Sequence, residues 1–371
     1  MAAKLSGAVD DRVAAWEACG AMALCGRPDG PPLGPPAPLV PRLRAIGDVL
    51  EHHGGAGMPD VFGLLAERAV LLGLRRGGNV SCSGSTRLLR SWDGWVAVTL
   101  ARPEDNTAAA AWLECDADPA DPWPVVAGVA PTRRVDELVG RATLLGLPVA
   151  ALAEARPQAP APAPFDGLPI GAVAFGDAGR HTKPFTVVEL GSLWAGPLCG
   201  RLLRLAGGRV LKVESRSRPD GARDHPVFYE RMNDGKDEAV VDLAELPRIL
   251  AQADVVIEAS RPRALQQLGI VAEAILGGQD GPAVWVSITG HGRGGEGALR
   301  VAFGDDAAVG GGLVVWDQDG PCFCADAIAD PLSGIVAAAA SLAALRSGRR
   351  WLLDVSMSAV ASHFAGVTLP I

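Results

Sequence analysis

The stretch FTVVELGSLWAGPLCGRLLRLAGGRVLKVE (residues 185–214) decides the fold. An apolar run, FTVVEL, leads through a turn that contains Gly191 and Gly196 into a helical segment that ends at Gly207, and a second apolar run, RVLKVE, follows. Apolar runs of this length are typical of buried strands, and two parallel strands need a crossover, usually a helix, between them. The stretch therefore predicts a β-α-β unit of a parallel sheet.

The alternation of strands and helices continues toward the C-terminus. Further strand-like runs are EAVVDL (238–243), DVVIEA (254–259) and AVWVSITG (283–290), and helical segments lie between them. This order favours an α/β fold whose large domain is a Rossmann-like, doubly wound parallel sheet. The turn after the first strand lacks the G-x-G-x-x-G spacing of nicotinamide dinucleotide sites, so NAD is a disfavoured ligand.

The first half of the chain has a different pattern. Helical periodicity appears in PRLRAIGDVLEHH (41–53) and MPDVFGLLAERAVLLGL (58–74), and STRLLRSWDGWVAVTLA (85–101) indicates a β-hairpin that turns at Asp93-Gly94. The segment ARPQAPAPAPFDG (155–167) has the composition of a semi-rigid linker. We expect helical segments in 1–80 that pack on the large domain, a small α+β domain in 81–155, an Ala/Pro linker in 156–167, and the Rossmann-like domain in 168–371.

Composition and charge exclude several classes of function. The net charge of −8, with a sequence pI near 5.3, indicates no basic face for nucleic acid. The seven cysteines are scattered without a C-x-x-C pair, which indicates reduced thiols, a cytoplasmic location and no metal site. The longest apolar run, residues 335–345, is too short to span a bilayer, so we expect no membrane partner.

A faint internal repeat links the two halves of the chain. CGAMALCGRPDGPP (19–32) parallels VGGGLVVWDQDGPC (309–322), and both contain Asp-Gly-Pro. Asp330 follows the second copy, and Val40 holds the corresponding place after the first. If the two copies are related, the first copy has lost its acid.

Asp330 stands at the start of ADPLSGIVAAAASLAAL (329–345), a segment that is otherwise small and largely apolar. Pro331 suits the first position of a helix, and the free N–H groups and dipole of a helix N-terminus favour an anion. Asp is also a common helix cap. The pattern therefore allows two interpretations: a carboxylate that caps the helix, or a reactive carboxylate held at its mouth.

Five motifs in the second half resemble the class III CoA-transferases, also called the L-carnitine dehydratase/bile-acid-inducible protein F group. They occur in the family's order and together cover roughly residues 185–365. The motifs are residues 185–214, NDGKDEAVVDL (233–243), ADVVIEASRPRALQQLGI (253–270), VSITGHGRGGEG (286–297) and the stretch that carries Asp330. The first half resembles the later part of a family unit, which implies a permuted or fused-and-trimmed order of the two halves.

The resemblance implies site residues and partners. Asp330 matches the family's nucleophile. No metal or resident cofactor is expected, because coenzyme A and acyl-CoA act as substrates. The expected CoA-binding residues are Trp194, Ala195, Lys236, Arg261, Arg300 and Asp305. The resemblance also implies a homodimer whose partners are an acyl-CoA and a carboxylic acid.

Three functions are compatible with the resemblance. The first is a CoA-transferase that moves CoA between carboxylic acids through an anhydride and an aspartyl-CoA thioester on Asp330. The second is an acyl-CoA isomerase or racemase of the same family, which is disfavoured because Gly304-Asp305-Asp306 stands where the racemase branch has a histidine. The third is an acyl-CoA-binding protein without turnover.

Overall fold

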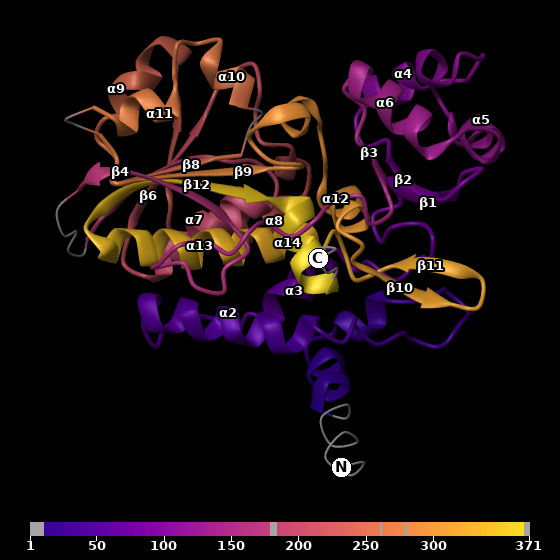
Figure 1. The fold of residues 1–371 in the computed structure, drawn as a ribbon, viewed down its shortest axis with the longest axis horizontal. Coiled ribbons are helices and arrows are strands. Elements are labelled where there is room, and N and C mark those ends of the chain that lie inside the picture. Colours follow the sequence, from indigo (N-terminus) through magenta and orange to yellow (C-terminus); the bar gives the residue numbers. More distant parts are fainter. Residues whose placement is uncertain (1–10, 179–183, 260–261, 279–280, 367–371) are drawn as a thin grey trace.

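A seven-stranded sheet lies at the centre of the computed structural model, which describes residues 11–178, 184–259, 262–278 and 281–366 (Figure 1). Its strand order is β4-β12-β9-β8-β5-β6-β7. The strands are β4 (Gly171–Asp177), β5 (Thr186–Leu190), β6 (Arg209–Glu214), β7 (Asp237–Val240), β8 (Val255–Glu258), β9 (Val284–Thr289) and β12 (Arg349–Ser356). Every neighbouring pair is parallel except β4 and β12, which are antiparallel.

Helices cover both faces of this sheet (Figure 1). The helices on one face are α7 (Ala195–Leu205), α8 (Pro226–Asn233) and α13 (Ala329–Ser347), and those on the other are α9 (Leu246–Leu250), α10 (Pro262–Gln266) and α11 (Ala272–Leu276). Successive strand residues alternate between two cores: Val187 and Val286 belong to the first, and Val188 and Trp285 to the second. Both faces of the central strands β5, β8 and β9 are buried and mainly apolar, and the predicted doubly wound α/β fold is confirmed.

The parallel strands have the Rossmann arrangement. Numbered in chain order from β5, they lie across the sheet in the order 3-2-1-4-5-6. The chain therefore leaves β5 toward one edge of the sheet and β8 toward the other, which opens a crevice at the carboxyl ends of these two strands. Ligands of open α/β sheets bind at such a switch point.

Two helices from the first half of the chain, α2 (Leu39–Gly54) and α3 (Gly63–Leu72), pack on α13. The side of α13 that faces its neighbours is built from small residues. The run Ala337–Ala340 is fully buried, and a Cβ at Gly334 would lie 2.8 Å from the carbonyl oxygen of Ala195. Small side chains thus let α13 approach α7 closely, which positions the first turn of α13 against the first turn of α7.

The two copies of the faint repeat lie side by side. Arg27 Nε of the first copy donates to Asp317 Oδ2 of the second at 2.7 Å. Val40 and Asp330 are each the second residue of a long helix, α2 and α13 respectively. The two copies therefore have the same relation to the helix that follows them. The permuted order that the resemblance implies stays a prediction.

Residues 86–151 form a small antiparallel sheet of order β1-β2-β3 with three helices beside it. Its elements are β1 (Thr86–Arg90), β2 (Trp95–Thr99), α4 (Pro103–Leu113), α5 (Trp123–Val129), α6 (Val135–Leu145) and β3 (Val149–Ala151). Arg90 pairs with Trp95 across the turn, so the predicted hairpin is confirmed. A core of its own, with Val98, Trp112 and Leu138, holds this unit together.

Four elements near Asp330 were not predicted individually. They are α12 (Gly304–Gly310), the hairpin of β10 (Val314–Asp317) and β11 (Gly320–Phe323), and α14 (Met357–Ala365). The N-terminal residue of α12 lies against Asp330, as described below. Among the described residues, no helix has both the length and the hydropathy that crossing a bilayer requires.

Candidate active site

A cavity of about 540 Å³ opens at the switch point between β5 and β8. Its wall includes Ser192 and Leu193 after β5, Ala259 after β8 and Gly290 after β9. Asp330 lines the same cavity. The sheet topology therefore places the predicted nucleophile in the crevice where ligands of this fold bind.

Asp330 does not cap its own helix. The N-cap position of α13 is Ile328, no side-chain hydrogen bond caps this end, and Asp330 is the second residue inside the helix. Instead, the backbone N–H of Ala195, the first residue of α7, faces the carboxylate and lowers its pKa. The helix-cap interpretation is therefore wrong, and the carboxylate lies at the junction of two helix N-termini.

Burial raises the pKa of Asp330 to about 7, from an ordinary value of 3.8. The nearby charges of Asp305 and Asp326 raise this pKa as well, whereas Arg68 and the Ala195 N–H lower it. At neutral pH the group is thus divided between acid and carboxylate. A partly desolvated carboxylate is a stronger nucleophile than one in water, provided that it is ionised.

Gly304 makes room for the Asp330 side chain. A Cβ at position 304 would overlap Asp330 Oδ2 and the carbonyl oxygen of Ala327. We expect Gly304→Ala to lower acylation of Asp330 by about a hundredfold, because small displacements of a reacting group have effects of this size. The measurement is the rate of adduct formation with an acyl-CoA, and the control is Gly294→Ala, where a Cβ would meet no atom within 4 Å. Equal rates in both variants would contradict this role of Gly304.

Arg68 of α3 supplies a positive charge behind Asp330. Its Nε and Nη2 donate to the two carboxylate oxygens of the fully buried Asp326, at 2.8 and 2.6 Å. The guanidinium carbon also lies 5.1 Å from the centre of the Trp194 ring. Sequence reasoning missed Arg68, because an arginine in an amphipathic helix is normally solvated and nothing nearby in the sequence marks it.

Two further buried acids join the small sheet to the site. Asp305 accepts from the backbone N–H of Ala327 at 2.9 Å, and Asp306 accepts from Thr99 Oγ1 of β2 at 2.8 Å. Burial raises the pKa of Asp305 to about 6 and that of Asp306 to about 7. Asp305, a predicted CoA-binding residue, does not line the cavity. Its side chain is buried behind the cavity wall.

These raised pKa values predict how stability depends on pH. Between about pH 4 and pH 7 the folded chain holds protons on Asp305, Asp306 and Asp330 that the unfolded chain has released. The contribution of these three groups to the free energy of unfolding therefore falls as pH rises through this range and levels off above it. We expect Asp306→Asn to raise the unfolding midpoint at pH 8 and to have little effect near pH 4, measured by urea titration. The exposed control Asp136→Asn should shift the midpoint by the same amount at both pH values. The same pH-independent shift in Asp306→Asn would refute the raised pKa of Asp306.

The other predicted CoA-binding residues fall into three groups. Ala195 and Arg300 line the cavity. The Trp194 ring is buried against Phe228, with ring centres 5.6 Å apart, and Lys236 is buried in an ion pair, so both side chains lie in the core beside the cavity. Arg261 lies outside the described residues.

Four arginines line the cavity, and Asp330 is the only acid among its described lining residues. They are Arg102, Arg218, Arg263 and Arg300. Arg218 and Arg263 are exposed and have no ion-pair partner among the described residues. Arg102 comes from the small α+β unit and was missed in the sequence. The surplus of positive charge suits an anionic ligand, although the chain as a whole is acidic.

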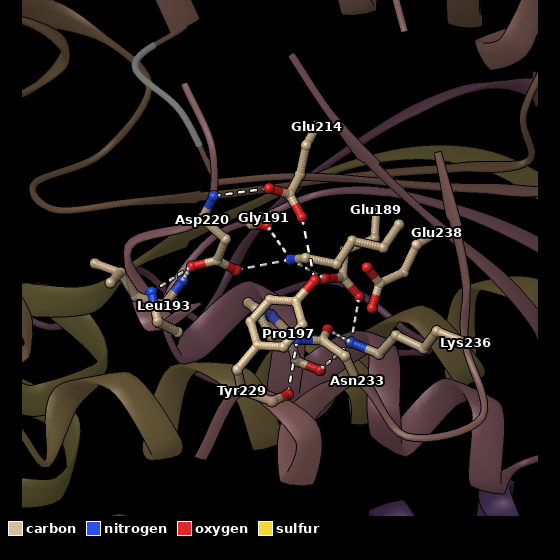
Figure 2. A network of polar contacts seen from close by, with 12 residues as sticks. Glu189, Gly191, Leu193, Pro197, Glu214, Asp220, Tyr229, Asn233, Lys236 and Glu238 are labelled. Atoms are coloured by element: carbon tan, nitrogen blue, oxygen red, sulfur yellow. Dashed lines mark hydrogen bonds and ion pairs between the residues drawn. The ribbon is translucent and has the colours of Figure 1, made fainter. Parts of the chain in front are cut away.

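A buried ionic network fixes the turn between β5 and α7 (Figure 2). Lys212 Nζ of β6 donates to the carbonyl oxygen of Gly191 at 2.9 Å, to Asp220 at 2.8 Å and to Glu189 at 3.3 Å. Asp220 in turn accepts from the backbone N–H of Leu193 at 2.8 Å.

The same turn also packs tightly on itself. A Cβ at Gly191 would lie 2.9 Å from the Cα of Gly196, and Leu193 has a positive φ of 67°. The network therefore holds in place a strained turn that ends at the N–H facing Asp330.

Comparisons with known proteins find similarity over about half of the chain. The chain is 27% identical over 199 residues to a succinyl-CoA–D-citramalate CoA-transferase of Chloroflexus aurantiacus, covering 48% of the chain and 49% of that protein. It is 31% identical over 208 residues to a succinate–glutarate CoA-transferase of Agrobacterium fabrum, covering 47% and 50%. The chain thus spans about half the length of these curated relatives.

Solved structures give matches of the same extent. A hypothetical protein from Mycobacterium tuberculosis is 27% identical, with a TM-score of 0.45, and the match covers 51% of this chain and 57% of that one. A CAIB/BAIF family protein from Brucella suis is also 27% identical, with a TM-score of 0.44 and coverages of 51% and 56%. The model of CoA-transferase family III matches residues 183–370, just over half of the sequence. This chain belongs to CoA-transferase family III.

Proposed function

We propose that the protein transfers CoA between carboxylic acids, with Asp330 as the nucleophile. One observation carries the proposal: Asp330 is the only acid on the described wall of a cavity that otherwise carries four arginines. The cavity lies at the switch point of a Rossmann-type sheet, where nucleotide-containing ligands bind. Family membership makes an acyl-CoA the expected ligand.

The arginines without acidic partners are suited to the phosphates of CoA. Arg218 follows β6 and Arg263 belongs to α10, so they extend from strands on the two sides of the switch point. A guanidinium offers forked donors that match phosphate oxygens. Ala195 and Arg300 also line the cavity, and Arg300 is paired with Glu154 at 2.6 Å.

The reaction requires two successive exchanges on Asp330. A carboxylate oxygen of Asp330 attacks the thioester carbonyl of the donor. The C–S bond breaks, CoA leaves as the thiolate, and a mixed anhydride between the acyl group and Asp330 remains. The thiolate then attacks the aspartyl carbonyl, which releases the donor acid and forms an aspartyl-CoA thioester. An acceptor carboxylate repeats these steps in reverse order, and Asp330 is regenerated. Covalent catalysis thus divides one difficult exchange into steps with lower barriers.

The N–H of Ala195 has two uses in this scheme. In the resting protein it stabilises the ionised form of Asp330 and lowers its pKa. When the aspartyl carbonyl is attacked, negative charge develops on its oxygen, and a donor already in place stabilises that charge without reorganisation. The turn fixed by Lys212 holds this donor in position.

The curated relatives support a transferase more than an isomerase. Both are named for transfer of CoA between acids, one from succinyl-CoA to D-citramalate and one between succinate and glutarate. A racemase of the expected type needs a histidine, and none of the described residues that line the cavity is a histidine. His291 stands between the lining residues Gly290 and Gly292, and burial lowers its pKa to about 3.

The proposal extends to a cytoplasmic homodimer. All seven cysteines are unpaired, which fits a reducing compartment. The dimer rests on the family resemblance, and light scattering tests it: the mass of one 38.2 kDa chain at micromolar concentration would rule it out.

An isotope experiment tests the proposed activity and separates the three candidate functions. The protein is mixed with succinyl-CoA and ¹³C-labelled glutarate in deuterium oxide, and the thioesters are analysed by mass spectrometry. Label in the CoA thioester without deuterium at the α-carbon is the expected result. Deuterium uptake without labelled thioester would establish the isomerase, and neither change, despite CoA binding, would establish a binding protein.

A further inference from the structure

The small α+β unit contributes a charged side chain to the wall of the cavity. Arg102 is the N-cap residue of α4, and its side chain is 33% exposed. It lines the cavity that contains Asp330 and also a second hollow of about 490 Å³. That second hollow is formed by the small unit alone, with Asn106 and Thr107 among its lining residues.

A short series of contacts connects Arg102 to the nucleophile. Asp330 Oδ2 packs against Gly304, as shown above. Phe303 directly precedes Gly304 and also lines the cavity, and the guanidinium carbon of Arg102 lies 5.7 Å from the centre of the Phe303 ring. Arg102 is therefore connected to the Asp330 carboxylate through two consecutive residues of the cavity wall, Phe303 and Gly304.

Asp105 holds the Arg102 side chain in place but does not use all of its hydrogen-bond donors. Nε and Nη2 donate to Asp105 at 3.0 and 2.6 Å, and Asp105 is almost fully buried. Nη1 has no acceptor among the described residues. The pair with Asp105 thus fixes the orientation of the guanidinium, and its outer donor stays available for a ligand.

The position of Arg102 relative to Asp330 separates it from the arginines assigned to CoA. The Ala195 side of Asp330 leads to the loop that carries Arg218, through the contact of Leu193 with Asp220. The Gly304 side leads to Phe303 and the small unit. We therefore expect an acyl group whose carbonyl carbon is at Asp330, and whose CoA is bound by Arg218, to extend toward Arg102.

We propose that Arg102 binds a second carboxylate of the acyl group, so that the protein acts on dicarboxylic acids with a short carbon chain. This inference rests on the proposed transferase function and adds the substrate class. The Phe303 ring flanks the aliphatic part of the acid, and the outer donor of Arg102 holds its distal carboxylate.

Substitution of Arg102 tests the subsite through a ratio of substrates. The ratio compares kcat/KM for succinate with kcat/KM for butyrate, which has the same chain length and lacks the distal carboxylate. We expect Arg102→Met to lower this ratio about 10- to 100-fold, the range that corresponds to a lost charge-assisted hydrogen bond. Arg102→Lys keeps the positive charge but lacks the forked donors of a guanidinium. Its ratio is expected to lie between those of the wild type and Arg102→Met.

The control is Arg134→Met, an exposed arginine of the same unit that pairs with Asp93 at 3.1 Å and lies outside the cavity wall. It should leave the ratio unchanged. If Arg102→Met lowers both rates in equal proportion, Arg102 only supports the fold and the proposal is overturned. An unchanged ratio overturns it as well.

A binding measurement covers the case in which the wild type transfers CoA to no acid, which would refute the proposed function itself. Calorimetry then compares succinate with butyrate on the full chain in the presence of CoA. Binding of succinate that is stronger than that of butyrate and is lost in Arg102→Met supports the subsite. Equal affinities refute it.

Discussion

Replacing Asp330 by asparagine is expected to abolish CoA transfer while CoA still binds. The amide has nearly the shape of the carboxylate, so the cavity and the contact with the Ala195 N–H are kept, but the nucleophilic oxygen is lost. Removal of a covalent nucleophile costs several orders of magnitude in kcat, and we expect a decrease of at least about a thousandfold. Steady-state transfer and CoA affinity by calorimetry are the two measurements.

The fold of this variant provides an internal control. Because burial raises the pKa of Asp330, the asparagine variant should be as stable as the wild type or more stable at pH 8. Asp136→Asn, which changes an exposed carboxylate, should leave the transfer rate unaltered. Transfer by Asp330→Asn within tenfold of the wild type would contradict the covalent mechanism.

The second large effect is expected at Lys212, whose side chain is fully buried between Glu189 and Asp220. Lys212→Met fills a similar volume but leaves the negative charge around Asp220 without its counterion. Breaking a buried ion pair on one side destabilises proteins by about 3 to 5 kcal/mol, and we expect a loss of that size in the free energy of unfolding. Urea titration measures it.

Two comparisons show whether the stability loss of Lys212→Met comes from the buried network or from the removal of any long cationic side chain. Arg209→Met removes a cation from the exposed start of the same strand and should change stability by less than about 0.5 kcal/mol. The second comparison is made without urea, at a temperature at which Lys212→Met is folded. Acylation of Asp330 in this variant should also be slow, because Lys212 no longer fixes the turn that carries the Ala195 N–H. A small stability loss with normal acylation would exclude the positioning role.

Strand patterns in the second half of the sequence predicted five strands of the sheet, β5 to β9, whereas β4 and β12 were not predicted. The strands β5, β6, β8 and β9 appear as apolar runs because both faces of a doubly wound sheet are buried. The run EAVVDL was predicted as a strand over 238–243, but β7 ends at Val240. This strand lies at the edge of the sheet and pairs only with β6, so fewer neighbours extend it.

The residues around Asp330 were predictable only in part. Asp330 and Ala195 lie in motifs that carry the family resemblance, and the structure places both at the cavity. Arg68 and Arg102 come from segments far from Asp330 in the chain, and their roles depend on tertiary contacts such as the one between Arg68 and Asp326. No local pattern marks such contacts.

The prediction for Lys236 shows a different limit. The family resemblance implied that Lys236 binds CoA. Its Nζ instead donates to Glu189 at 2.7 Å and to the carbonyl oxygen of Pro197 at 2.9 Å, inside the core (Figure 2). The partner acid, Glu189, lies on β5, far from Lys236 in the sequence, so the position of Lys236 alone did not reveal the pair.

The most direct measurement is the intact mass of the protein after mixing with acyl-CoAs and quenching in acid. We predict an adduct of acyl or CoA mass that is removed by hydroxylamine, maps to the peptide that contains Asp330, and is absent from Asp330→Asn. Succinyl-CoA is the first donor to use. The absence of any adduct at Asp330 with a panel of acyl-CoAs, under conditions where CoA binds, would contradict the proposed mechanism.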